Sequence, residues 1–213
     1  MSGKAKVFGI GLNKTGTTTL GVCLERLGYD HISNRRDLLA AWRRGDAQAV
    51  YDVIDRHDSF EDWPWPLMYE ALADRYPDAR FILTRRKSPE VWLKSLSKHA
   101  LSSRPITHSR KLAYGYHYPH YAEAEHLAIY RDHLDAVPRF FEARGEADRL
   151  LTLCWEDGDG WPELGRFLGV PVPDEPLPKT NVAGADARQA GTIRRKTNEL
   201  LIALGRAKHA LLG

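Results

Sequence analysis

The fold of this 213-residue chain is decided by the stretch Gly9-Ile10-Gly11-Leu12-Asn13-Lys14-Thr15-Gly16-Thr17-Thr18-Thr19-Leu20. The apolar run at 6–10 predicts a short buried strand, the glycines and threonines predict a tight turn, and the apolar spacing from Leu20 to Leu27 predicts a helix. In a strand, loop and helix of this kind, backbone N–H groups and the positive end of the helix dipole converge on an anion. The stretch therefore predicts a phosphate-binding loop.

The lysine of this loop stands in an unusual place. Nucleoside triphosphatases carry G-x-x-x-x-G-K-[ST], with the lysine directly after the second glycine. Gly11 and Gly16 have that spacing, but Thr17 occupies the lysine position, and Lys14 lies two residues before the second glycine. The order resembles the 5′-phosphosulfate loop of the sulfotransferase family, whose pattern is roughly P-K-[ST]-G-T-T, with Asn13 in place of the proline.

This resemblance implies a donor and a role for each loop residue. The family's donor is 3′-phosphoadenosine 5′-phosphosulfate (PAPS), and no metal is needed. By resemblance, Thr15, Gly16, Thr17 and Thr18 hold the 5′-phosphosulfate. Lys14 would offset negative charge on the bridging oxygen as the phosphoadenosine leaves. A glycine-rich turn with a solvated lysine is the alternative interpretation of the motif taken alone.

A second motif lies further along the chain. The β-branched and aromatic run at 79–84 predicts a strand, and the residues at 89–101 predict a helix. The family has an arginine at the end of this strand and a serine in the helix that follows, and both hold the 3′-phosphate of the donor. Ser95 matches the serine, whereas Arg86 stands one residue away from the family's spacing and leaves Lys87 in register. The resemblance implies that Arg86 and Ser95 bind the 3′-phosphate. The alternative is that the basic residues form a solvated cluster on the surface.

The third motif concerns the catalytic base. Many members of the family carry a histidine in an H-x-P step, and this chain has Asp62-Trp63-Pro64 before a helix predicted at 67–76. An acceptor hydroxyl must lose its proton as the S–O bond forms, so a carboxylate or imidazole is needed within hydrogen-bond reach. The resemblance implies Asp62 as that base, and a helix cap is its alternative role. The rival bases are His57, Glu61 and His31.

The resemblance to the bacterial branch of the family runs through most of the chain. It includes the segments at 155–161, 164–173 and 176–181. The R-K-G loop with which the animal cytosolic branch closes over the 3′-phosphate is not found. The basic residues that could replace it are Lys179, Arg188, Arg194 and Arg195.

Composition favours one domain over residues 1–213. The hydrophobic content of 43% is enough for one sizeable core. The apolar runs are shorter than a membrane span, and no signal peptide precedes the first strand, so the sequence predicts a cytoplasmic protein. Two cysteines without metal or redox spacing are predicted to be reduced. A net charge of +3 suits an anionic cofactor better than nucleic acid.

Strands and helices alternate along the chain. This order predicts an α/β fold, a three-layer parallel sheet with helices on both faces as in P-loop nucleotide kinases, with ligands at the carboxyl ends of the strands. Pro138 predicts a kink or break near Val137. The expected strands lie at 6–10, 79–84 and 149–154, and the expected helices at 17–27, 36–44, 46–56, 67–76, 89–101, 122–144, 161–168 and 188–211.

Two segments, 31–66 and 100–121, are expected to set acceptor choice. The second contains Tyr114–Tyr121, where four tyrosines and two histidines could line an acceptor pocket or form a lid. The spacing of His117 and His120 suggests a metal site, but no acidic or cysteine partner lies nearby.

The sequence thus predicts a PAPS-dependent sulfotransferase that acts on a hydroxyl or amine of a small-molecule or glycan acceptor. A P-loop kinase or nucleotidase is one alternative, although it would need a metal-binding carboxylate where the second strand ends in Arg85-Arg86. A non-catalytic nucleotide-binding module on the same fold is the other alternative.

Overall fold

Five parallel strands form one sheet in the computed structural model, which describes residues 4–106, 109–178 and 187–212. Their order across the sheet is β2-β3-β1-β4-β5. All four pairings are parallel, and β1 lies at the centre between β3 and β4. The strands are β1 (Val7–Gly9), β2 (His31–Ile32), β3 (Ser59–Phe60), β4 (Arg80–Thr84) and β5 (Leu150–Leu153).

Two of these strands were not predicted. β2 and β3 have two residues each, and neither stands in a run of alternating or continuous apolar residues. They exist by pairing, because Ile32 lies opposite Phe60 on β3, and Phe60 lies opposite Phe8 on β1. Strands this short carry no periodic signal, so only the neighbouring strand identifies them.

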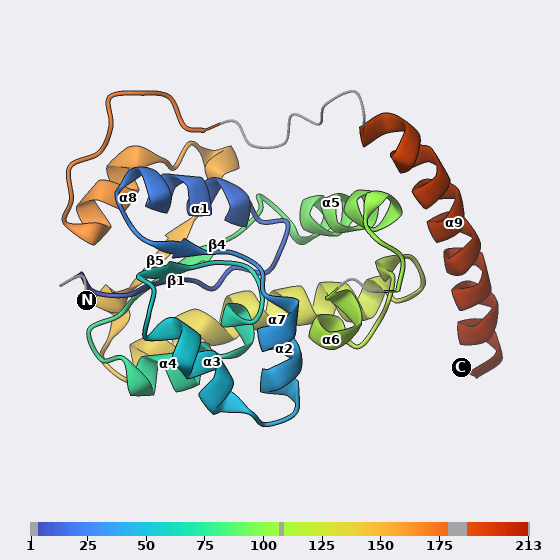
Figure 1. Ribbon diagram of the computed structural model, residues 1–213, viewed down its shortest axis with the longest axis horizontal. Coiled ribbons are helices and arrows are strands. Elements are labelled where there is room, and N and C mark those ends of the chain that lie inside the picture. The colour runs from blue at the N-terminus through green and yellow to red at the C-terminus, as the bar shows by residue number, and fades with distance from the viewer. Residues whose placement is uncertain (1–3, 107–108, 179–186, 213) are drawn as a thin grey trace.

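Helices cover both faces of the sheet, which confirms the predicted fold class (Figure 1). One face carries α1 (Thr17–Arg26) and α8 (Trp161–Leu168). The opposite face carries α2 (Arg36–Arg43), α3 (Ala47–Ile54), α4 (Tyr69–Arg75) and α7 (Glu123–Ala143). Beyond the carboxyl ends of the strands lie α5 (Pro89–Ser102), α6 (Arg110–Tyr114) and α9 (Ala187–Leu212). Short 3₁₀ turns are η1 (Trp65–Leu67), η2 (Pro119–Tyr121), η3 (Ala147–Arg149) and η4 (Trp155–Asp157).

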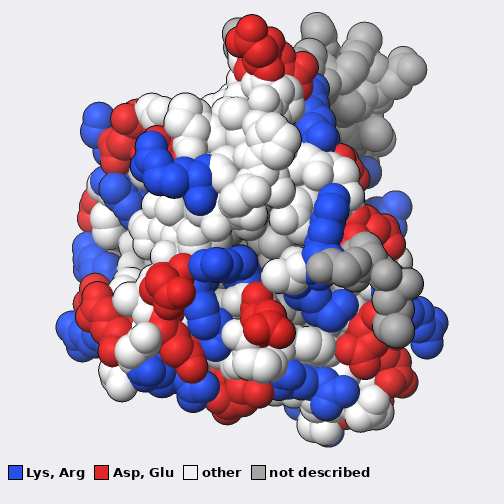
Figure 2. Space-filling model, turned by 90° about the vertical axis from the view of Figure 1, so that its left-hand side faces the viewer, with Lys and Arg blue, Asp and Glu red and all other residues white. Residues whose placement is uncertain are grey.

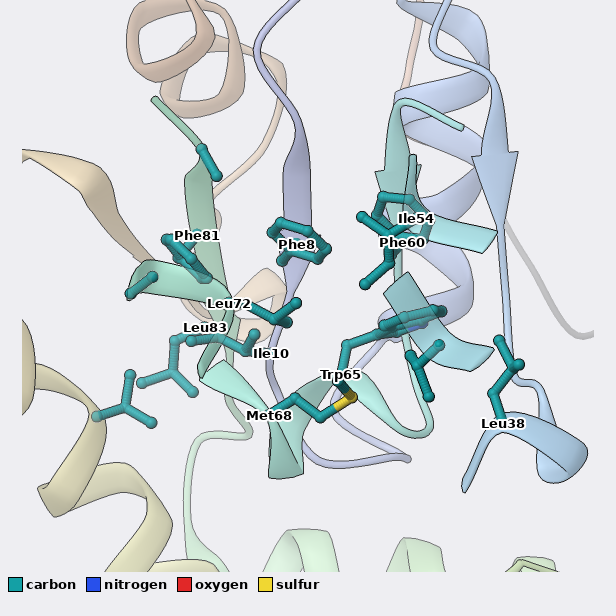
Figure 3. Close-up of a cluster of buried hydrophobic side chains, with 14 of the residues drawn as sticks. Phe8, Ile10, Leu38, Ile54, Phe60, Trp65, Met68, Leu72, Phe81 and Leu83 are labelled. Carbon is teal, nitrogen blue, oxygen red and sulfur yellow. The ribbon is translucent and has the colours of Figure 1, made fainter. Parts of the chain in front are cut away.

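Side chains alternate between two cores along the central strands. Phe8 and Phe81 point toward α2, α3, α4 and α7, where their ring centroids are 5.6 Å apart (Figure 3). Val7 and Ile82, each one residue away, point into the second core with α1 and α8. Both faces of these strands are buried, as expected for a parallel sheet between two helical layers.

Helix α7 continues through Pro138, so of the kink or break predicted near Val137, the break is wrong. Proline removes one N–H donor from a helix, but tertiary packing can outweigh that loss. Val137 and Phe141 are both fully buried against the sheet and hold the two sides of the proline in one helix. Burial of one face therefore keeps the element whole.

Candidate active site

The loop between β1 and α1 is pressed against two neighbouring strand ends, and its glycines make this possible. A Cβ atom on Gly11 would lie 2.1 Å from Oγ1 of Thr84 at the end of β4. A Cβ atom on Gly16, whose φ is 95°, would lie 2.3 Å from Cδ1 of Trp155. Glycine is required at both positions, because no side chain fits and the second backbone conformation is left-handed.

Asn13, which stands where the family has a proline, anchors the loop. Its side-chain oxygen accepts a hydrogen bond from the Tyr114 hydroxyl, and its backbone carbonyl accepts one from Nε1 of Trp92 at 2.9 Å. Thr15 also turns inward. Its hydroxyl donates to the Leu12 carbonyl at 2.7 Å and lies 2.6 Å from Oγ1 of Thr84. The Thr15 side chain therefore shapes the loop, and Thr15 does not line the cavity described next.

A cavity of about 350 Å³ opens at the N-terminus of α1. Its walls come from the loop, the segment after β3 and the segments after β4. The structure thereby brings together seven of the eight residues predicted for the site: Lys14, Gly16, Thr17, Thr18, Asp62, Arg86 and Ser95. The remaining lining residues are Asn13, Thr19, Asn34 and His99.

Lys14 and Arg86 give the cavity its positive charge. Burial lowers the pKa of Lys14, while the carboxylate of Asp62 opposes that shift. Arg86 is fixed by Glu156, whose Oε1 lies 2.6 Å from Nη2, and by the Lys14 carbonyl, 3.4 Å from Nη1. Nε of Arg86 is buried and has no hydrogen-bond partner in the described structure. An anion bound in the cavity would accept a hydrogen bond from this buried, unsatisfied N–H group.

The structure distinguishes Arg86 from its neighbour Lys87. The Arg86 side chain is 26% exposed and lines the cavity, whereas that of Lys87 is 68% exposed. Nζ of Lys87 lies 3.9 Å from Asp157. Arg86 and Ser95 therefore both line the cavity, whereas Lys87, which stands in the family's register, is mostly exposed.

His99 is a lining residue that the sequence analysis missed. It lies one turn after Ser95 on α5, a helix that begins at the Ser88 cap, where Val91 N–H donates to Ser88 Oγ at 3.3 Å. Burial, and then the charges of Lys14 and Arg110, lower the pKa of His99 to about 4. Its imidazole is therefore neutral at physiological pH. The i, i+4 spacing from Ser95 is the signal that could have found it.

Asp62 lines the same cavity as Lys14 and lies in an unusual environment. Both residues have left-handed backbones, with φ of 64° and 72°, a conformation that non-glycine residues adopt at a cost and that concentrates at functional sites. Burial, and then the neighbouring charge of Glu61, raise the pKa of Asp62. Its Oδ1 is buried without a hydrogen-bond partner in the described structure. This carboxylate is thus positioned and tuned to hold a proton.

The rival bases lie outside the lining of this cavity. Nδ1 of His57 is 2.8 Å from Oδ2 of Asp30 at the surface. Glu61 accepts a hydrogen bond from the Ser33 hydroxyl, and its Oε1 lies 4.0 Å from Nε2 of His31. Glu61 and His31 form a buried polar pair, and neither lines the cavity.

A second cavity of about 460 Å³ adjoins the first, since Gly16, Thr19 and Arg86 line both. Its other walls include Trp155 and the segment at 176–178. Trp155 therefore lines a hollow beside Arg86. Aromatic faces of this kind bind planar rings by stacking.

The structure describes the side chains of only two of the four basic residues that could replace the R-K-G loop. Lys179 and the side chain of Arg188 lie outside the described residues. Arg194 donates to the Ser102 carbonyl at 3.4 Å and Arg195 pairs with Glu199 at 2.9 Å, so both are engaged on or near α9. Neither lines the cavity.

The two acceptor segments are also divided between roles. In 31–66, α2 and α3 pack in the core, and Asn34 and Asp62 line the cavity. In 100–121, Tyr114 contacts the loop, and His117 lies with other residues along a groove beside α9. Among the described residues, no group of three or more His, Cys, Asp or Glu side chains is arranged to hold a metal ion. Cys23 and Cys154 are both buried and free.

Comparison with known proteins agrees with this geometry. Residues 6–185 match the family described as "Sulfotransferase domain". The Aspergillus versicolor protein named "Ava biosynthesis cluster protein M" is 26% identical over 225 residues, which cover 86% of this chain and 83% of that protein. None of the described helices has the length and apolar character needed to cross a membrane. From residue 6 to residue 185, this chain belongs to the sulfotransferase domain family, a family of transferases.

Proposed function

We propose that this protein is a PAPS-dependent sulfotransferase whose acceptor is a hydroxyl or amine of a small molecule or glycan. One observation carries the proposal: a single cavity joins Lys14 and Asp62, both with left-handed backbones, to Arg86 and Ser95. A cation and a carboxylate that line one cavity at a helix N-terminus are the groups that sulfuryl transfer to a protonated acceptor needs.

The residues present fit PAPS. The first-turn N–H groups of α1, at Thr17 and Thr18, are available to the 5′-phosphosulfate. Arg86, with its unsatisfied buried Nε, and Ser95 would hold the 3′-phosphate. Trp155 would take the adenine in the adjoining cavity. When bound, PAPS supplies a sulfuryl group on a phosphate that is a good leaving group.

Lys14 and Asp62 would divide the chemistry between them. Lys14 would stabilise negative charge on the departing oxygen, an electrostatic contribution that is large in a partly buried site. Asp62 would take the acceptor proton, and its raised pKa makes its ionised form a stronger base near neutral pH. His99 lies in the same cavity and is neutral, but its lowered pKa makes it a weaker base than Asp62.

Binding measurements test the donor. By calorimetry, we expect adenosine 3′,5′-bisphosphate to bind at least about tenfold more tightly than ATP with Mg²⁺, because Arg86 and Ser95 are assigned to a 3′-phosphate. Tighter binding of ATP with Mg²⁺ would favour a kinase or nucleotidase. Transfer of ³⁵S from labelled PAPS to a panel of phenols, alcohols and amines then tests catalysis. Tight bisphosphate binding without transfer to any of these acceptors would favour a non-catalytic module. The cytoplasmic location stays a prediction that cell fractionation would test.

A further inference from the structure

Helix α9 carries an apolar ridge that the proposed reaction does not use. Ile193, Leu200, Leu204 and Leu211 are 71%, 62%, 59% and 86% exposed. At about 100° per residue, these four side chains lie within about 40° of one line along the helix, over a length of about 27 Å. Four large apolar side chains in one row are more than scattered surface residues.

The rest of the protein holds α9 so that this ridge faces outward. Asn198 is fully buried on the inner side of the helix, where its Nδ2 donates to the carbonyls of Leu101 at 2.8 Å and Ser103 at 3.0 Å. Its Oδ1 accepts from the Tyr118 hydroxyl at 2.6 Å. Ile202 is buried on the same side. α9 therefore stands along one edge of the molecule, docked on α5 and η2 (Figure 1).

Positive charge flanks the ridge. Lys196 and Lys208 are exposed and lie about 60° to either side of its line. Glu199 is the one acidic residue in the sequence of α9, and Arg195 neutralises it at 2.9 Å. By contrast, the end of the molecule opposite α9 has Lys, Arg, Asp and Glu interspersed (Figure 2). The two charged side chains that the geometry places beside the apolar ridge, Lys196 and Lys208, are thus both positive.

An adjoining groove of about 570 Å³ extends the apolar surface. Its lining includes Ile106, Lys111, Tyr116, Tyr121, Leu204 and Lys208. Ile106 is 62% exposed across the groove from the ridge. Tyrosine and lysine have apolar bodies and polar tips, which suits them to the boundary between hydrocarbon and lipid headgroups.

We propose that the α9 ridge docks on a membrane surface containing anionic phospholipids. The ridge is convex and can insert between headgroups, while Lys196 and Lys208 remain at headgroup level to meet phosphate charge. A second copy of the chain would suit the apolar spacing, but it would bring lysines of like charge together along the seam. The proposal concerns a surface, not the donor cavity, and does not depend on PAPS.

Vesicle sedimentation with the full chain tests the proposal without donor or acceptor. We expect binding to phosphatidylcholine vesicles with about 30% phosphatidylglycerol, and at least about tenfold weaker binding to phosphatidylcholine alone or in about 0.5 M NaCl. Leu200→Ser/Leu204→Ser and Lys196→Glu/Lys208→Glu should each lower binding at least about tenfold. Matched controls are Val172→Ser, which changes an exposed apolar residue elsewhere, and Arg56→Glu/Arg166→Glu, which makes the same charge change.

Several results would overturn the proposal. These are no binding to anionic vesicles, equal binding to neutral vesicles, or α9 variants that bind as the wild type does. Sedimentation velocity without vesicles is the remaining arm, and a dimer dissociated by Leu200→Ser/Leu204→Ser would assign the ridge to a second copy. Far-UV circular dichroism and melting temperatures that match those of the wild type in every variant show that folding is intact, and neither measurement depends on the proposed function.

Discussion

Replacing Arg86 by alanine should remove most of the preference for a 3′-phosphate. The guanidinium lines the cavity, its Nη2 is held by Glu156 at 2.6 Å, and its buried Nε has no partner in the described structure. A charge-assisted hydrogen bond contributes about 1.5–3 kcal/mol. At about 1.4 kcal/mol per decade, Arg86→Ala should weaken adenosine 3′,5′-bisphosphate roughly tenfold to 150-fold.

The adjacent residue supplies a matched control. Lys87→Ala removes the same charge one position away, but the Lys87 side chain is 68% exposed and its Nζ lies 3.9 Å from Asp157. Solvent screens such a group, so affinity for the bisphosphate should change by less than about threefold. Arg86→Ala also breaks an ion pair with Glu156 that is partly exposed on both sides, at a cost to folding of about 0–1 kcal/mol. Both variants should therefore remain folded.

Calorimetric titration with adenosine 3′,5′-bisphosphate and with 5′-AMP gives the readout. Arg86→Ala should bring the two affinities close together, and Lys87→Ala should leave them apart. If Lys87→Ala erases the preference and Arg86→Ala does not, Lys87 holds the 3′-phosphate and the geometric argument fails. If Arg86→Ala weakens 5′-AMP as much as the bisphosphate, Arg86 binds another part of the nucleotide.

Three other substitutions test the site. Lys14→Ala should lower transfer by about two to three decades with a smaller loss of bisphosphate affinity, and equal losses would make Lys14 a simple anchor. Asp62→Asn should cut transfer by about two to four decades at unchanged bisphosphate affinity; retained turnover would move the base to His99 or the rivals. Because folding raises the Asp62 pKa, the native state takes up a proton, and its contribution to stability falls as pH rises through the folded-state pKa. Measured by urea unfolding, the free energy of unfolding of Asp62→Asn should therefore rise relative to that of the wild type between pH 4 and pH 8. A difference between the two proteins that stays constant over this range would contradict the raised pKa of Asp62. Gly16→Ala should lower the melting temperature more than Gly145→Ala does, because both glycines have positive φ, but an added Cβ would lie 2.3 Å from Trp155 at Gly16 and would meet nothing within 4 Å at Gly145.

The sequence alone determined the elements whose signals are local. The apolar run into Gly9, the glycine spacing and the apolar period of α1 predicted the donor loop, and the run at 79–84 predicted β4. These features are readable because turn chemistry and side-chain period act between near neighbours. Parallel strands place their carboxyl ends at one edge of the sheet. For this reason seven of the eight predicted residues, which lie in segments that follow strands, line one cavity.

Tertiary structure decided what depends on distant partners. β2 and β3 are recognised as strands only through their pairing with neighbouring strands. α7 continues through Pro138 because the residues around the proline are buried. Of the four candidate bases in the sequence analysis, only Asp62 lines the cavity. His99, which the sequence analysis missed, lines it from α5.

The outward face of α9 was likewise settled by contacts. Its apolar spacing is present in the sequence, but the burial of Asn198 and Ile202 determines which side meets the protein and which side is left exposed. Which face of a helix or which of two adjacent cations meets a cavity depends on packing between segments up to about a hundred residues apart. Local propensity carries no information about such contacts, because they form only when the whole chain has folded.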